Sequence, residues 1–176
     1  LEKWEEMPLA DLPRDEVRQL LDNYQEPLQL IDRAARCERC DWGLSGRLRK
    51  QGIATLLPEV QPLRAALRFL SIRARLEMAG GHIDRAVRTL QTGFVLARDV
   101  GEAPTLINSL VGNAIAFIAA RQVEELIQTE KGPNLYWALT DLPRPFIDLR
   151  RPLQGERVAA YATFPGLAEI AADPRA

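Results

Sequence analysis

Histidine and cysteine are scarce in this 176-residue chain, which contains one histidine and two cysteines. Catalytic and metal sites that need several histidines therefore find little support, and a small fold held together by many disulfides is excluded. The chain also lacks an excess of one charge, since 23 basic and 24 acidic side chains leave a formal net charge of −1. That balance argues against a wholly basic nucleic-acid binder.

Long apolar runs are missing too, because no stretch reaches the roughly 18 continuous apolar residues that a membrane-spanning helix needs. The sequence therefore predicts no membrane span. What the chain does contain is 47% hydrophobic and 27% charged residues, the composition of an ordinary globular domain. A chain of this length buries about 70% of its extended surface on folding, so we expect one domain over residues 1–176.

Apolar residues recur every three or four positions through most of the chain, which is the period of an amphipathic helix. No run alternates as a strand does, so we predict an all-α fold of about six helices, separated by glycine and proline. Pro27 should kink or divide the first of them. The expected helices cover residues 15–36, 63–79, 83–100, 105–129, 135–142 and 146–161.

Two segments are expected to lie outside regular structure. Residues 43–52 are rich in glycine and basic residues, and we predict a flexible loop there. Residues 165–176 follow the last apolar repeat and are predicted to form a weakly ordered tail. The most apolar helix, 105–120, leaves little room for a polar face, so we expect it at the centre of the fold, covered on several sides.

The helices on either side of Gly80-Gly81 should form a tight antiparallel hairpin, because glycine readily adopts the left-handed conformation in which many helices end. The hairpin resembles one tetratricopeptide repeat, although Gly93 replaces an expected alanine and a second hairpin, near Gly132, is offset by more than that family's period of about 34 residues. We therefore predict an irregular stack of hairpins. The resemblance is carried by Leu70, Ala74, Gly81–Ala86 and Leu90.

A second resemblance covers more of the chain. Several segments together are similar to an uncharacterised family of bacterial helical proteins that are often exported. This resemblance implies no activity and supplies no functional residue, but it favours an exported or periplasmic location. Because the chain starts at Leu1 within a polar run, we expect a trimmed or processed chain, so the lack of a signal peptide in it does not point to the cytoplasm. The segments are Cys40–Gly43, Ala54–Pro58, Gly101–Ile107 and Leu142–Pro145.

Cys37 and Cys40 form the one spacing in the chain that points to chemistry, since two thiolates three residues apart can hold a zinc ion. Zinc takes four ligands, and the others would have to be carboxylates, His82 or groups from a second copy. Redox chemistry favours a thiolate at a helix N-terminus, whereas this pair follows a predicted helix. Three interpretations stay open: thiols without a special role or in a local disulfide, a thiol-redox site, and a metal site.

Arginines near the Gly80-Gly81 hairpin are candidates for a basic binding patch. On a shared surface, their guanidinium groups would suit an acidic peptide, a phosphate or a nucleic acid. The alternative is a set of solvated helix faces balanced by Glu77 and Asp84, and the near-zero net charge argues against nucleic acid. The candidate residues are Arg64, Arg68, Arg75, Arg85 and Arg88.

A catalytic set is not evident in the sequence. Glu124 and Glu125 share a helix without a histidine companion, and no serine lies in a nucleophile-elbow pattern. We therefore predict an interaction module without catalytic activity or cofactor, which takes a protein or peptide into a groove between hairpins. The alternatives are a metal-binding or thiol-redox protein that uses Cys37 and Cys40, an enzyme whose site in the helical bundle is built from Glu124, Glu125 and arginines, and a structural subunit that covers its groove by self-association.

Overall fold

The computed structural model describes residues 1–130 and 132–167, and over these ranges it contains nine α-helices and no strand. Seven of the nine helices have at least seven residues. The predicted all-α fold is confirmed, with more helices than the six or so expected. Most of the predicted tail, residues 168–176, lies outside the described part of the chain.

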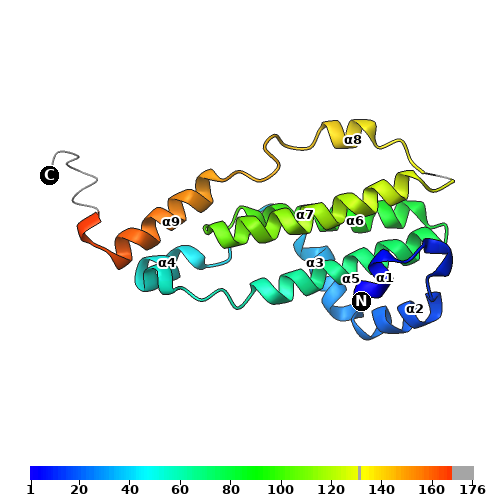
Figure 1. Cartoon of the computed structure of the whole chain (residues 1–176), viewed down its shortest axis with the longest axis horizontal. Helices are drawn as coiled ribbons and strands as arrows, with labels where there is room; N and C mark the ends of the chain where they lie inside the picture. Colours follow the sequence, from blue (N-terminus) through cyan, green and yellow to red (C-terminus); the bar gives the residue numbers. More distant parts are fainter. Residues whose placement is uncertain (131, 168–176) are drawn as a thin grey trace.

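Three long helices run side by side along the long axis of the molecule (Figure 1). Helix α6, which lies between the other two in the sequence, packs antiparallel against both of them, and α5 also contacts α7. Leu67, Leu90 and Ile115 are among the side chains buried where the three helices meet. These helices are α5 (Val60–Ala79), α6 (Ile83–Gly101) and α7 (Leu106–Ile127).

The α5–α6 hairpin turns at Gly80-Gly81, as the sequence predicts. Gly81 has a φ of 74°, in the left-handed region. Its N–H donates to the carbonyl of Met78 at 2.9 Å, and the N–H of His82 donates to the carbonyl of Glu77 at 2.8 Å. This pair of bonds is a Schellman motif, which satisfies the last carbonyls of α5 and reverses the chain within two residues.

Helices α6 and α7 approach closely at a glycine. A β-carbon at Gly112 would stand 2.5 Å from the Cα of Gly101 and 2.6 Å from the carbonyl oxygen of Ala97. The absent side chain at position 112 therefore sets the α6–α7 distance.

Helix α7 begins after Thr105, whose side-chain oxygen accepts the N–H of Asn108 at 3.1 Å, as an N-cap residue does.

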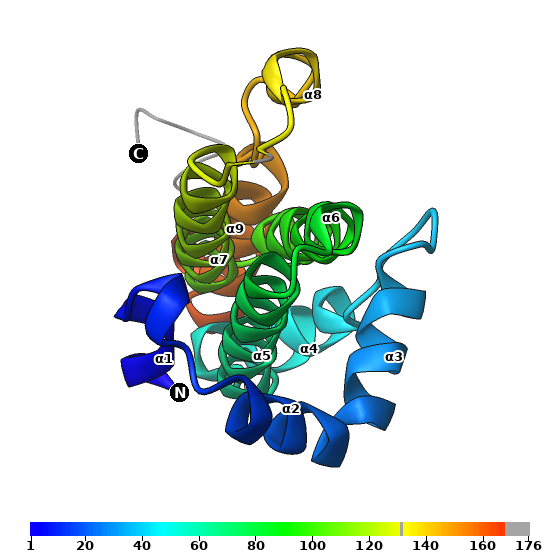
Figure 2. The same cartoon turned by 90° about the vertical axis from the view of Figure 1, so that its right-hand side faces the viewer.

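Residues 1–34 cover one side of α5, away from α8 (Tyr136–Thr140) (Figure 2). One helix was expected over residues 15–36, but the chain divides at Tyr24, three residues before Pro27. Proline then occupies the third position of the second helix, where a backbone N–H has no partner within the helix. The elements are α1 (Glu2–Glu6), a 3-10 turn (Leu9–Asp11), α2 (Arg14–Asn23) and α3 (Gln25–Ala34).

The prediction of a flexible loop over residues 43–52 is wrong. This segment forms α4 (Leu44–Gln51), followed by a 3-10 turn at Gly52–Ala54. Leu44 and Leu48, one helical turn apart, are both buried, and α4 packs on α9 (Arg150–Thr163). An apolar pair buried against another helix stabilises this short helix despite its glycines.

The prediction that 105–120 is covered on several sides is also wrong for one face of α7. Residues such as Leu110 and Phe117 point away from α5 and α6 and are exposed. By length and composition alone, α7 could cross a membrane, and it is the one such helix within the described residues. After it, the described residues 132–149 run back along α6 and α7, and the one α-helix among them is the short α8 (Tyr136–Thr140) (Figure 1).

Candidate functional site

An open concavity lies between α2–α3 and the Gly80 end of the α5–α6 hairpin, with a volume of about 530 Å³. Most of its charged lining is basic, and these side chains come from three helices and a turn. We call it the arginine concavity. Its charged and ionisable lining residues are Arg14 and Arg18 from α2, Arg73 and Glu77 from α5, His82 in the turn, Arg85 from α6, and Asp22.

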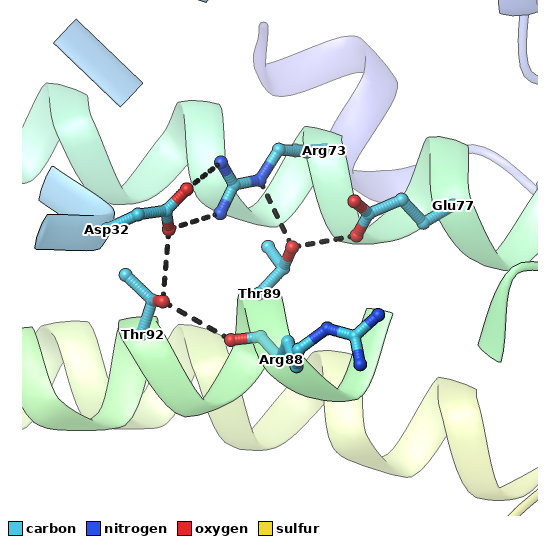
Figure 3. Close-up of polar contacts among 6 residues, drawn as sticks. All are labelled: Asp32, Arg73, Glu77, Arg88, Thr89 and Thr92. Carbon is cyan, nitrogen blue, oxygen red and sulfur yellow. Dashed lines mark hydrogen bonds and ion pairs between the residues drawn. The ribbon is translucent and has the colours of Figure 1, made fainter. Parts of the chain in front are cut away.

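Two lining residues of the arginine concavity, Arg73 and Glu77, belong to a polar network that joins α3, α5 and α6 (Figure 3). Arg73 donates two parallel hydrogen bonds, each 2.8 Å long, to the carboxylate of Asp32 on α3. Its Nε donates to the hydroxyl of Thr89 on α6 at 3.1 Å, and that hydroxyl donates to Glu77 at 2.7 Å. One guanidinium group therefore holds three helices in register.

Asp32 receives a further hydrogen bond from α6, since the hydroxyl of Thr92 lies 3.1 Å from its Oδ1. The same hydroxyl lies 3.2 Å from the carbonyl oxygen of Arg88 (Figure 3). Burial alone would raise the pKa of Asp32, but the hydrogen bonds and charge of Arg73, with the bond from Thr92, outweigh it. The pKa of Asp32 therefore lies below its ordinary value, and the carboxylate is ionised at neutral pH.

Glu77 is shifted in the opposite direction. Burial raises the pKa of Glu77, and the hydrogen bond from Thr89 and the charges of Arg73 and Arg85 offset this only in part. Its negative charge is therefore less favoured than that of an ordinary surface glutamate. Of the two carboxylates in the network, Asp32 is bound bidentately by Arg73, while Glu77 is the one that more readily stays protonated.

The remaining basic groups of the arginine concavity are exposed to solvent. Within the part of the chain that the structure describes, Arg14 and Arg85 form no ion pair, and Arg18 contacts Asp15 at 2.6 Å. Both partners of that last pair are highly exposed, so the pair contributes little. Guanidinium groups on α2 and on α6 are thus available to an incoming anion.

The five arginines predicted as one basic patch do not share a surface. Arg85 lines the arginine concavity and Arg88 is exposed on α6. Arg64 is exposed on α5, and Arg68 reaches α1, where it contacts Glu2 at 3.3 Å and Glu5 at 3.8 Å.

Arg75 is the clearest departure from the predicted patch, because only 3% of it is exposed. It pairs with Glu125 of α7 and donates to the carbonyl oxygen of Met7. Sequence reasoning missed Arg14 and Arg18 instead. Their spacing of one helical turn on α2 was the available signal, but nothing in the sequence places α2 opposite Arg85.

Cys37 and Cys40 lie after α3 as free thiols. Cys37 is exposed and its sulfur donates to the carbonyl of Arg33 at 3.6 Å, whereas Cys40 is half-buried. Burial raises the pKa of the Cys40 thiol, and Asp99 and Asp41 raise it further, which disfavours the thiolate that nucleophiles and metal ligands need. Among the described residues, no three His, Cys, Asp or Glu side chains are grouped so that they could hold a metal ion.

Comparisons of the chain with known protein families, curated proteins and solved structures find no match. The structure therefore shows an all-helical protein, and the two family resemblances rest on local motifs alone.

Proposed function

We propose that this protein is an interaction module and that the arginine concavity binds an acidic segment of a partner protein. The observation that carries the proposal is the position of exposed guanidinium groups on two separate helical layers around one open concavity. Charge-assisted hydrogen bonds from arginine to carboxylates are about twice as strong as neutral ones, and they are directional. A segment with two or more carboxylates can therefore contact α2 and α6 together.

The polar network supports this proposal by removing competition from within the protein. Arg73 occupies Asp32, so that carboxylate does not recruit Arg14 or Arg85. Asp22 and Glu77 are the two acidic side chains of the lining. Burial raises the pKa of Glu77, so its negative charge competes less with that of a bound carboxylate than an ordinary glutamate would. An acidic segment can thus bind in the concavity while the hydrogen bonds of the polar network stay in place.

The character of the lining favours a peptide over a small apolar ligand. Pockets for small organic ligands are mostly apolar with a few polar groups, whereas charged and amide side chains make up more than half of the residues that line this concavity. The described chain has more apolar cavities elsewhere, such as one of about 240 Å³ between α8 and the α6–α7 pair. The smaller cavity of about 210 Å³ between α4 and α9 also has exposed arginines from two helices, Arg49 and Arg151, but the arginine concavity has basic side chains from three helices.

Fluorescence anisotropy with labelled peptides tests the proposal. We expect glutamate- and aspartate-rich peptides to bind, glutamine-substituted versions not to bind, and affinity to fall as salt rises. Replacing Arg14 or Arg85 with glutamine should weaken binding by about tenfold each, the loss of one charge-assisted contact.

The matched control is Arg64→Gln, which removes an exposed α5 arginine that does not line the concavity. It should leave peptide affinity unchanged. Equal losses for Arg64→Gln and Arg85→Gln would show that binding depends on overall charge rather than on this site, and would refute the proposal. Failure of every acidic peptide to bind would refute it as well.

A further inference from the structure

The outer face of α7 carries a stripe of apolar side chains that no other described part of the chain covers. Leu110 is 71% exposed and Phe117 is 67% exposed. Both lie on one face of the helix, because they are seven residues apart. We define the α7 stripe as Leu106, Ile107, Leu110, Ala114 and Phe117, which are all exposed.

We infer that the α7 stripe is the contact surface for a second copy of this chain, packed antiparallel in a two-fold dimer. A contiguous apolar patch of this kind marks an interaction surface. A two-fold contact requires that the patch complement itself. The α7 stripe meets that requirement through the order of its side chains, large at Leu110, small at Ala114 and large at Phe117.

The register follows from that order. If the two-fold axis passes midway between Leu110 and Phe117, each Leu110 faces Phe117 of the other copy. The axis then falls between Asn113 and Ala114. The small side chain of Ala114 lets the two helices approach, and the amide of Asn113 donates to the carbonyl of Ser109 within its own helix at 2.9 Å. Leu110 and Phe117 are about 10 Å apart along the helix at 1.5 Å per residue, so both pairs fit within three turns.

Charge complementarity supports the same arrangement. Arg121 lies one turn beyond Phe117 and Leu106 one turn before Leu110, so the antiparallel register places Arg121 of one copy opposite Leu106 of the other. The N–H of Leu106 is held by the carboxylate of Glu156 at 2.7 Å. Arg121 therefore approaches an anionic group, whereas a parallel pairing would set the two Arg121 side chains against each other.

A bilayer fits this surface less well than a second copy does. Arg121 and Glu124 are exposed on the same side of α7, and charged groups within a membrane-inserted face are costly. The buried face of α7 is also packed against α6 and α5 along the helix. The surface of one helix stripe is smaller than the roughly 800 Å² that each partner buries in a stable interface. We therefore expect a weak dimer that dissociates on dilution.

Sedimentation velocity over a wide range of protein concentration tests the inference. The unaltered protein should shift from monomer to dimer as concentration rises, and Phe117→Glu or Leu110→Glu should raise the dissociation constant by about tenfold or more. Leu56→Glu is the control, because Leu56 is 78% exposed outside the α7 stripe. All three changes are at exposed positions, and circular dichroism will verify that the variants stay folded.

Disulfide cross-linking tests the register in chains whose native cysteines are replaced by serine. A mixture of the Leu106→Cys and Arg121→Cys chains should form a cross-linked heterodimer, while neither chain should cross-link with itself. Self-linking of each chain alone would indicate a parallel pair and overturn the inference. A protein that stays monomeric at every concentration would overturn it too, including one that instead sediments with phosphatidylcholine vesicles. Peptide binding at the arginine concavity uses other residues, so either proposal can fail independently.

Discussion

Arg73 uses all three nitrogens of its guanidinium group in hydrogen bonds. Its guanidinium group bonds Asp32 through two nitrogens and Thr89 through the third. Both Arg73 and Asp32 are largely shielded from solvent, where such bonds are stronger than at the surface. This side chain therefore links the N-terminal helices to the α5–α6 hairpin.

Asp32→Asn is expected to destabilise the protein by about 2 kcal/mol, because it removes a charge-assisted bidentate pair and leaves Arg73 poorly paired. Urea unfolding at neutral pH measures the change. Asp148→Asn is the matched control, since Asp148 also contacts an arginine, Arg150, but at the surface; it should leave stability almost unchanged. Similar losses in the two variants would contradict the role assigned to the network.

Glu77→Gln tests the raised pKa of Glu77. A carboxyl whose pKa is raised by folding contributes stability that is present below its unfolded pKa of about 4.3 and lost as pH rises through the folded pKa. Glutamine keeps an acceptor for Thr89 and carries no charge. The variant should therefore match the unaltered protein near pH 4 and exceed it in stability near neutral pH. Urea unfolding at both pH values measures this, and a variant that is less stable at neutral pH would contradict the assignment.

Individual side-chain environments were only partly predictable from the sequence. Arg64, Arg68 and Arg75 share one face of α5 by helical period, so the sequence offers no reason to separate them. They differ because the segment around Met7 and the C-terminal half of α7 cover Arg75 alone. Contacts between residues this far apart in the chain are not encoded in local spacing.

Helix α4 shows how glycine content can mislead at the scale of an element. Gly43 and Gly52 flank the helix and Gly46 lies within it, which together give the segment the composition of a loop. The signal for a helix was the pair Leu44 and Leu48. Its meaning depends on α9, which buries both leucines, and α9 lies more than ninety residues later in the chain.

Two glycines within helices should respond oppositely to replacement by alanine. Gly112→Ala forces a β-carbon against the backbone of Gly101, and we expect a loss of about 2 kcal/mol or more. Gly46→Ala meets nothing within 4 Å, so it should stabilise the protein by up to about 1 kcal/mol through helix propensity. Thermal unfolding measures both, and a neutral Gly112→Ala would show that α6 and α7 can separate without cost.

At the scale of the whole molecule, the helices α5, α6 and α7 pack closely together, whereas the connection between α7 and α9 contacts them less. In that connection, side chains such as Leu135 and Phe146 pack against the three helices. The ring of Phe146 meets that of Phe94 edge-on, with centroids 5.8 Å apart. Helix α8 itself has only five residues, and its Trp137 is 72% exposed.

Hydrogen exchange followed by mass spectrometry should separate these two parts. Among the α-helices, the amides of α8 are expected to exchange fastest and those of α6 slowest, because local opening is easiest where few residues are buried and contacts are sparse. Peptides covering α4 provide an internal comparison, since that short helix has buried leucines. Equal protection of α8 and α6 would mean that the connection packs more firmly than its exposure implies.

The architecture was predictable to the extent that helical period and turn residues specify it. The long helices and the Gly80-Gly81 hairpin follow from the sequence, because each depends on neighbours within a few residues. The arginine concavity does not follow from it, since it forms only where α2 and α3 fold against the end of that hairpin. Its arginines come from segments about seventy residues apart, and no local pattern relates Arg14 to Arg85.

The buried guanidinium of Arg75 imposes an order on how the polypeptide matures during synthesis. Its counter-ion, Glu125, emerges from the ribosome 50 residues later. In a nascent chain that ends within α6, Arg75 has neither this counter-ion nor the half of α7 that covers it, so its guanidinium stays hydrated and its native contacts remain incomplete. The first two long helices therefore settle fully only after the third has been translated, which makes α7 the element that completes the native state.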